Sequence, residues 1–167
     1  MIDHERVWLA VEARFSMPPH SIHGPAHWRR VEAIGLALAE ATGADRDVVH
    51  LFACFHDSRR ETDGTDPDHG RRGAALARSM RGELFDLADD AFALLEFACT
   101  HHTDARTSKD PTIATCWDAD RLDLARLGFR IERRLLSTAP AKRSEFQGWA
   151  TSLCQLPPDR WGHPEAR

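Results

Sequence analysis

The residues best suited to chemistry gather where an apolar stretch from Leu51 to Phe55 ends in adjacent His56 and Asp57. An imidazole nitrogen beside a carboxylate oxygen is half of a site for a divalent metal. An aspartate after so apolar a run is costly to bury without a cation or another partner, so the pair is interpreted as functional. The alternative is a structural Asp57 that accepts hydrogen bonds near a helix end. Further candidate ligands are spread along the chain: His27, His69, His101, His102 and Asp120.

These candidates stand in or at the ends of helical patterns, and a helical bundle builds metal sites from such inward-facing side chains. His27 opens one predicted helix, His56 and Asp57 close another, and a third ends at the adjacent histidines 101 and 102. Asp120 lies inside a further predicted helix. The helices are therefore expected to bring these residues together in one cluster.

Apolar residues at helical spacing predict an all-α fold, and no segment alternates with the period of a β-strand. The predicted helices cover residues 3–15, 26–41, 45–60, 67–80, 84–100, 111–122, 129–136 and 146–153. Pro25 and Pro111 are expected near helix starts, Gly43 after a helix end, and Asp66 as a cap. The third predicted helix is apolar all round, so it is expected at the centre.

Length and composition predict a single helical domain, residues 1–156, and a C-terminal tail, residues 157–167, that is expected to be poorly ordered. The net charge of −4 supplies no global field for nucleic acid, so an anionic substrate must be met by local arginines. Four cysteines without paired spacing indicate free thiols in a reducing compartment. With no signal peptide and no membrane-spanning apolar run, a cytoplasmic protein is expected, of undetermined oligomeric state.

In order along the chain, His27, the pair His56-Asp57 and Asp120 resemble the H…HD…D signature of the HD-domain metal-dependent phosphohydrolases. Three motifs in this order are specific in a way that a lone His-Asp pair is not. The resemblance covers roughly residues 25–123. It implies a helical bundle in which these four residues hold a divalent metal.

His69 and the pair His101-His102 resemble the additional ligands of the branch that binds two metals, which includes the cyclic-dinucleotide phosphodiesterases of the HD-GYP type. The Gly-Tyr-Pro motif is absent and the chain has no tyrosine, so that substrate is not carried over. The number of ions, and the choice between His101 and His102, are left open. Asp118 competes with Asp120 for the last position, and the Ala-Asp-Arg-Leu context favours Asp120.

The expected activity is hydrolysis of a phosphate ester of a small molecule, with a nucleotide as the leading candidate, by a metal-bound hydroxide. Asp57 is expected to bind metal and accept a proton, while Arg60 and Arg72, about one helical turn after His56 and His69, bind the phosphate. Histidine and carboxylate ligands suit manganese, iron, cobalt, nickel or zinc better than magnesium. Two alternatives keep the same residues: a di-iron oxygenase of the related fold, and a nucleotide-sensing module without turnover.

Overall fold

The computed structural model describes residues 2–161, and all regular structure within this range is helical. The α-helices are α1 His4–Glu12, α2 Pro25–Thr42, α3 Arg46–Phe55, α4 His69–Met80, α5 Asp89–His101, α6 Pro111–Asp123 and α7 Ser144–Ser152. Short 3-10 turns follow α6 or flank α7: η1 Leu124–Leu127, η2 Arg133–Leu135, η3 Pro140–Lys142, η4 Leu153–Gln155 and η5 Pro158–Arg160. The predicted all-α class is therefore confirmed for the described chain.

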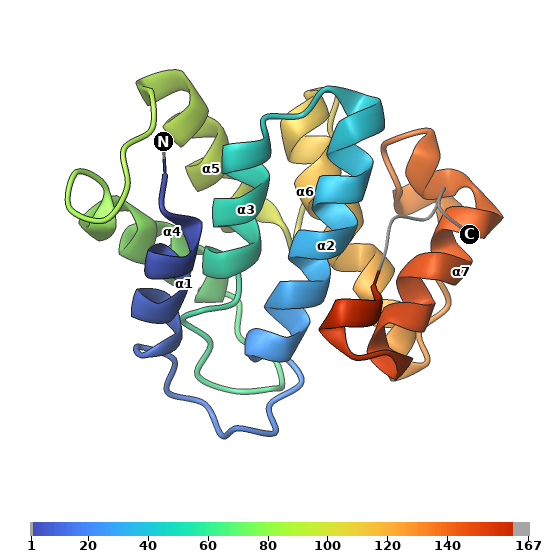
Figure 1. The fold of residues 1–167 in the computed structure, drawn as a ribbon, viewed down its shortest axis with the longest axis horizontal. Helices are drawn as coiled ribbons and strands as arrows, with labels where there is room; N and C mark the ends of the chain where they lie inside the picture. Colours follow the sequence, from blue (N-terminus) through green and yellow to red (C-terminus); the bar gives the residue numbers. More distant parts are fainter. Residues whose placement is uncertain (1, 162–167) are drawn as a thin grey trace.

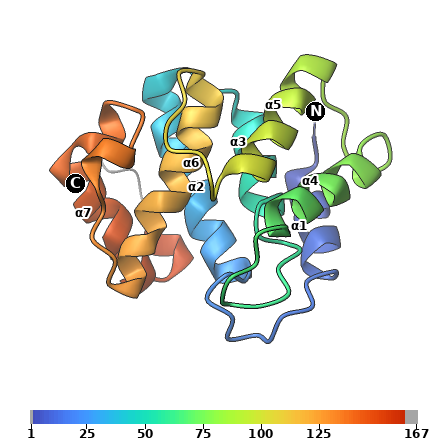
Figure 2. The same ribbon diagram turned by 180° about the vertical axis from the view of Figure 1, so that it is seen from behind.

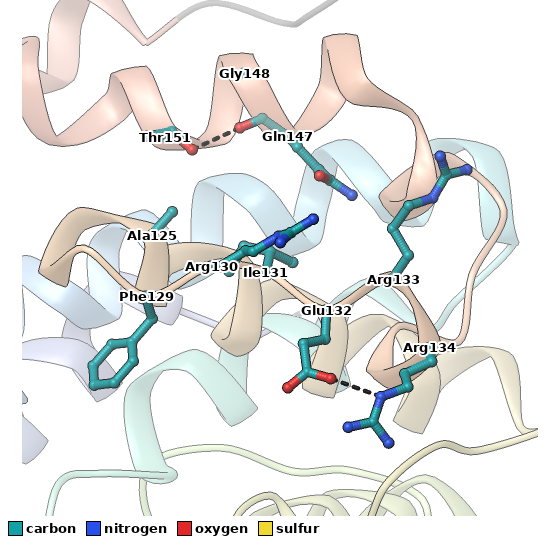
Figure 3. A pocket seen from close by; sticks show the side chains of 10 residues that line it. All are labelled: Ala125, Phe129, Arg130, Ile131, Glu132, Arg133, Arg134, Gln147, Gly148 and Thr151. Carbon is teal, nitrogen blue, oxygen red and sulfur yellow. Dashed lines mark hydrogen bonds and ion pairs between the residues drawn. The ribbon is translucent and has the colours of Figure 1, made fainter.

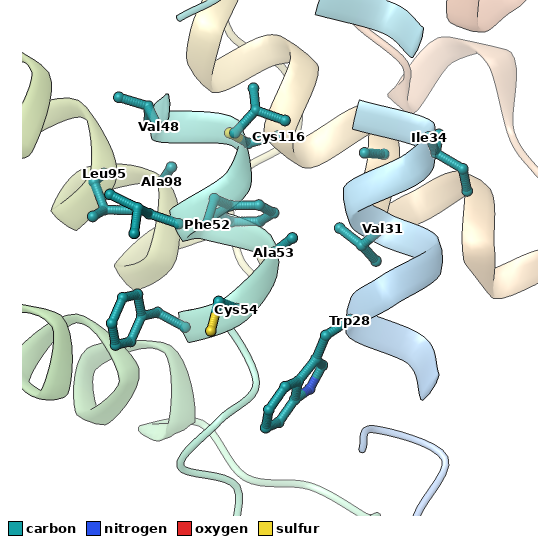
Figure 4. Packing of buried hydrophobic residues seen from close by; sticks show 14 of the residues in the cluster. Trp28, Val31, Ile34, Val48, Phe52, Ala53, Cys54, Leu95, Ala98 and Cys116 are labelled. Atoms are coloured by element: carbon teal, nitrogen blue, oxygen red, sulfur yellow. The ribbon is translucent and has the colours of Figure 1, made fainter. Parts of the chain in front are cut away.

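Helices α2, α3, α5 and α6 form the centre of the bundle (Figure 1). On one side, α1 packs against α3 and α4 packs against α5, while α7 lies beside α6 on the other side. The view from behind shows α6 in front of α2 and α5 beside α3 (Figure 2). In the core, Trp28 and Ile34 of α2 and Phe52 of α3 are fully buried. Phe52 lies beside Leu95 and Ala98 of α5 and Cys116 of α6 (Figure 4). This packing makes α3 the central helix, as its apolar composition predicts.

Local signals account for the helix ends that deliver the candidate ligands. Pro25 occupies the first position of α2, where its missing N–H is no loss, and Gly43 ends that helix. The Asp45 side chain accepts hydrogen bonds from two backbone N–H groups at the start of α3, and Asp110 does the same for α6, ahead of Pro111.

Helix α3 ends at Phe55, earlier than the predicted Arg60. Beyond it the chain tightens into turns, in which the Arg60 N–H donates to the Asp57 carbonyl at 3.2 Å. Helix α4 begins at His69, with Asp68 and not the predicted Asp66 at the cap position, and the Asp68 side chain makes no capping bond. The Asp66 carboxylate instead accepts hydrogen bonds from the Glu61 N–H in the loop and from the Arg72 side chain of α4. Both corrections concern the polar loop between α3 and α4, where side-chain bonds replace helical ones.

Two further predicted helices were wrong in extent. Helix α5 begins at Asp89 and not at residue 84, because the Gly82 N–H donates to the Phe85 carbonyl at 2.8 Å and closes a turn there. Residues 129–132 are not helical, and only the three-residue turn η2 forms in the predicted 129–136 helix. Phe129 is 62% exposed, so its apolar side chain does not mark a buried helix face.

The chain after α7 packs back onto the helix as far as Trp161. The Trp161 indole N–H lies 3.0 Å from the carbonyl oxygens of Leu153 and Leu156, and the Trp149 indole donates to the Trp161 carbonyl. The remainder of the predicted tail, residues 162–167, lies outside the described residues. Among the helices of residues 2–161, none combines the length and the apolar character that crossing a membrane requires.

Candidate metal centre

His27, from the first turn of α2, and His56, just after α3, face each other in the interior. Nδ1 of His56 lies 3.1 Å from the carbonyl oxygens of Phe52 and Ala53, and Nδ1 of His27 lies 2.7 Å from Oδ2 of Asp123. Because a carbonyl only accepts, Nδ1 of His56 carries a proton, and Nε2 presents a lone pair in the neutral form of the ring. The two Nε2 atoms are 3.2 Å apart.

His69 and His102 repeat this arrangement. Nδ1 of His69 donates to the Asp66 carbonyl, and Nδ1 of His102 donates to the Cys99 carbonyl at 2.7 Å. Their Nε2 atoms are 2.8 Å apart, and both side chains are almost fully buried. Two lone pairs at this distance repel each other, so a proton or a metal cation must lie between them. Metal-binding histidines commonly donate from one ring nitrogen to a carbonyl, as Nδ1 does here, and bind the metal through the other nitrogen.

Asp57 lies between the two histidine pairs and divides its oxygens between them. Oδ2 is 3.6 Å from Nε2 of His27 and 3.7 Å from Nε2 of His56. Oδ1 is 3.1 Å from Nε2 of His69 and 3.6 Å from Nε2 of His102. The Asp57 side chain is 3% exposed, and such a carboxylate can contact a cation on each side.

Asp120, one turn before the end of α6, completes the group around His27 and His56. Its Oδ1 atom lies 3.3 Å from Nε2 of His27 and 3.6 Å from Nε2 of His56. The competing Asp118 accepts the backbone N–H groups of residues 137 and 138 at 2.8 and 2.7 Å, so it holds the segment after η2 and takes no part in the cluster.

The ligand atoms fall into overlapping groups in which all atoms lie within 4.8 Å of one another. The groups are His27, His56 and Asp120; Asp57, His69 and His102; and His23, His27 and Asp57. The donor set of imidazole nitrogens and carboxylate oxygens is compatible with a transition metal. The sequence-based candidates therefore converge on one buried cluster, with the exception of one histidine.

That exception is His101, which the fold directs away from the cluster. Its ring lies against Phe97, with centroids 4.5 Å apart, while the next residue, His102, faces His69. Adjacent residues at a helix end point about 100° apart, so only one of the two enters the site. Of the two histidines between which the sequence left the choice open, His102 is the one that lies in the cluster.

Two further residues, which were not among the ligands expected from the sequence, contact Asp57. Nδ1 of His23 lies 2.8 Å from Oδ2, and Nε of Arg60 donates to Oδ1 at 3.1 Å. Arg60 also donates to the carbonyls of Thr62 and Gly64, so its guanidinium fastens the loop to Asp57. Arg60 therefore lies beside the cluster even though α3 ends at Phe55, whereas the sequence prediction assumed that this helix continues to Arg60.

Arg72 lies in a different setting from Arg60. Its Nε donates to the Arg59 carbonyl at 3.0 Å and its Nη2 to both carboxylate oxygens of Asp66 at 2.7 Å. Within residues 2–161 no contact between Arg72 and a cluster side chain is observed. Its predicted role in phosphate binding stays a prediction, and its contacts give that role no support.

Two glycines on α4 allow the helix ends that carry the ligands to meet. A Cβ at Gly70 would lie 2.2 Å from the Cys99 carbonyl oxygen and 3.1 Å from the His102 ring. A Cβ at Gly73 would lie 2.2 Å from the Phe55 carbonyl oxygen. Real Cβ atoms do not come this close, so any larger residue would push α4 away from the ends of α3 and α5.

Asp123 was missed at the level of sequence, although it orients His27. The carboxylate is 1% exposed, accepts a hydrogen bond from Nε of Arg30 at 2.7 Å and forms an ion pair with Nε of Arg126 at 2.9 Å. One signal could have found it. Asp123 follows Asp120 by three residues on the same helix, so the two side chains share a face.

The charges in the cluster shift its proton affinities. Burial lowers the pKa of His27, but hydrogen bonds to Asp120 and Asp123 outweigh this effect and raise it to about 9. Burial also raises the pKa of Asp57, yet the His56 charge and three histidine hydrogen bonds hold that pKa well below its usual range. Burial raises the pKa of Asp120 as well, but hydrogen bonds from His27 and His56 outweigh this effect and hold that pKa well below its usual range. Both carboxylates therefore remain ionised and suited to a cation.

A surface hollow lies elsewhere, between the segment after α6 and helix α7 (Figure 3). Its lining includes Phe129, Arg130 and Arg133, with Glu132 paired to Arg134 at 2.7 Å. None of the residues that line it belongs to the histidine and aspartate cluster. The chemistry of the buried cluster, and not the size of this hollow, identifies the candidate site.

Comparison with known protein families, curated proteins and solved structures gave no match. The arrangement of the side chains is therefore the basis for interpreting this site.

Proposed function

We propose that this protein is a metal-dependent phosphohydrolase of the HD-domain type, acting on a phosphate ester of a small molecule, with a nucleotide as the leading candidate. One observation carries the proposal: Nε2 of His69 lies 2.8 Å from Nε2 of His102 although both Nδ1 atoms donate to carbonyls. The same pairing in His27 and His56, with Asp57 between the pairs, supports two ions sharing one carboxylate.

The residues of the chain have distinct tasks in this proposal. His27, His56, Asp57 and Asp120 would hold one ion, and Asp57, His69 and His102 the other. Divalent ions supply an acidified water and neutralise charge on phosphoryl oxygens when they are bound. The carbonyls behind the histidines and the carboxylate of Asp123 keep the ligands oriented before substrate arrives. The role of Asp57 as a proton acceptor stays a prediction, since its lowered pKa makes it a weak base.

Nearby positive charge supports an anionic substrate. Arg60 donates to the ligand Asp57, while Arg30 and Arg126 form ion pairs with Asp123, the residue that binds His27. Three guanidinium groups therefore lie close to the ligands. Guanidinium groups near reacting atoms stabilise phosphoryl charge. A di-iron oxygenase has no comparable need for them, and a sensor without turnover has no need for a complete ligand set.

One experiment distinguishes the three activities. Purified protein with measured metal content is incubated with manganese, iron, cobalt, nickel, zinc or magnesium and a panel of phosphorylated metabolites that includes nucleotides. Phosphate release, oxygen consumption and ligand binding are followed in parallel. We expect phosphate release that depends on the metal and is lost in His56→Ala. Oxygen consumption without phosphate release would favour the oxygenase, and ligand binding with neither would favour the sensor.

A further inference from the structure

Arg126 holds a hydrogen-bond donor that has no acceptor. Its side chain is 7% exposed, Nε forms an ion pair with Oδ2 of Asp123 at 2.9 Å, and Nη2 donates to the Ile22 carbonyl. Nη1 is buried and makes no hydrogen bond, which is true of no other buried side-chain nitrogen or oxygen within residues 2–161. A buried donor without an acceptor is unfavourable, and native structures rarely keep one without a purpose.

The contacts of Arg126 place it beside the candidate metal centre. The Ile22 carbonyl, which accepts from Arg126, directly precedes His23, and His23 binds Asp57. The other partner of Arg126, Asp123, binds His27. Both partners of Arg126 therefore adjoin the cluster. Burial lowers the pKa of the Arg126 guanidinium, and the charges of Asp123, Asp120 and Asp57 offset only part of this lowering.

This side of the cluster is also its more open side. The side chains of His23 and Asp120 are 15% and 14% exposed, whereas those of His27, His56 and His69 are at most 2% exposed. A substrate that reaches the ions must approach where the cluster meets solvent. Arg126 therefore lies by the route that a phosphate group would take.

The other nearby arginines are bound differently. Arg30 uses Nε and Nη2 on the Asp123 carboxylate, and Arg60 uses Nε on Asp57 and Nη1 on two loop carbonyls. Arg126 alone combines a bond to Asp123 with a buried, unused Nη1.

We propose that Arg126 binds an anionic phosphoryl oxygen of the substrate through Nη1. This inference rests on the proposed function and names a residue that the sequence did not single out. A phosphate oxygen supplies the missing acceptor, and a charge-assisted bond from a guanidinium is short and strong. Because Nη1 is covered in the present structure, binding of the anion requires a local shift of the atoms around it.

The test measures binding of inorganic phosphate to the manganese-loaded protein by titration calorimetry, so that its readout is independent of turnover. Arg126→Ala is compared with Arg30→Ala, a matched control because both arginines form ion pairs with Asp123. We expect Arg126→Ala to weaken phosphate binding roughly tenfold or more, with a much smaller change for Arg30→Ala. Arg126→Lys should recover part of the affinity, because it keeps the charge but not the planar donor pair. Manganese content is measured for each variant.

Equal losses of phosphate affinity in Arg126→Ala and Arg30→Ala would overturn the inference, since both would then act only by holding Asp123. An Arg126→Lys protein that binds phosphate as tightly as the wild type would also overturn it, and this comparison remains available if Arg126→Ala fails to fold. A wild-type protein that binds no phosphate would do the same. A different outcome would contradict the proposed function alone. In that case the wild-type protein hydrolyses no phosphate ester, yet its phosphate affinity is lost selectively in Arg126→Ala.

Discussion

Oδ2 of Asp123 lies 2.7 Å from Nδ1 of His27, with side chains that are 1% and 2% exposed. The carboxylate fixes the proton of the imidazole on Nδ1 and turns Nε2 towards His56 and Asp120. Arg30 and Arg126 hold the carboxylate in turn, so the orientation of a candidate ligand depends on a network that joins α2, α6 and η1.

Replacing this carboxylate tests its role directly. We expect Asp123→Asn to lower metal affinity about 10- to 100-fold, because the neutral amide holds the His27 tautomer less strongly. Manganese titration of the metal-free protein measures the change. Asp118→Asn is the matched control, since Asp118 is equally buried on α6 but binds backbone N–H groups away from the cluster. It should lower stability and leave metal affinity unchanged, and equal affinity losses in both variants would refute the assignment.

The two adjacent histidines after α5 give a sharp comparison. His102→Ala should remove about one equivalent of metal per chain, because the pair that His102 forms with His69 is broken. His101→Ala should keep the full metal content, since that ring packs on Phe97. Metal analysis after gel filtration distinguishes the two. Identical metal content in both variants would show that His102 is not a ligand.

The close approach of α4 to the cluster can be tested at Gly70. Gly70→Ala places a Cβ 2.2 Å from the Cys99 carbonyl that orients His102. We expect a stability loss of about 1–3 kcal/mol and weaker metal binding, measured by urea unfolding and manganese titration. Gly148→Ala on α7 is the control, because its added Cβ meets no atom within 4 Å. If both variants behave like the wild type, α4 does not need this close approach.

Stability and metal affinity of the metal-free protein should change in opposite directions with pH. The pKa of His27 is raised from 6.5 to about 9 by its carboxylate partners, in spite of its burial. A raised pKa stabilises the folded state fully below pH 6.5, and this contribution, about 3 kcal/mol, is lost as pH rises through about 9.

Over the same range, metal affinity should increase, because a metal displaces the proton from His27. Urea unfolding in a chelating buffer and manganese titration at a series of pH values measure both effects. His27→Gln should flatten the stability change. A wild-type stability that is constant between pH 6.5 and 9 would show that His27 is not protonated in the folded state.

The sequence by itself determined the helical class and the types of residue in the candidate site. Asp45 and Asp110 cap helices by reaching only two or three residues along the chain, so such signals can be read without a fold. The apolar run before His56 likewise predicts a buried helix whose end meets polar partners. Helix extents that depend on competing side-chain bonds, as near Asp66, were not predictable in this way.

Only the tertiary structure decided how the candidates meet. Asp123 binds His27 across 96 positions of sequence, and His69 meets His102 across 33. Such contacts depend on how closely helices pack, here on the missing side chain of Gly70, and not on local torsional preference. The choice of His102 over its neighbour has the same physical reason, because the rotation of α5 against α4 decides which imidazole enters the site.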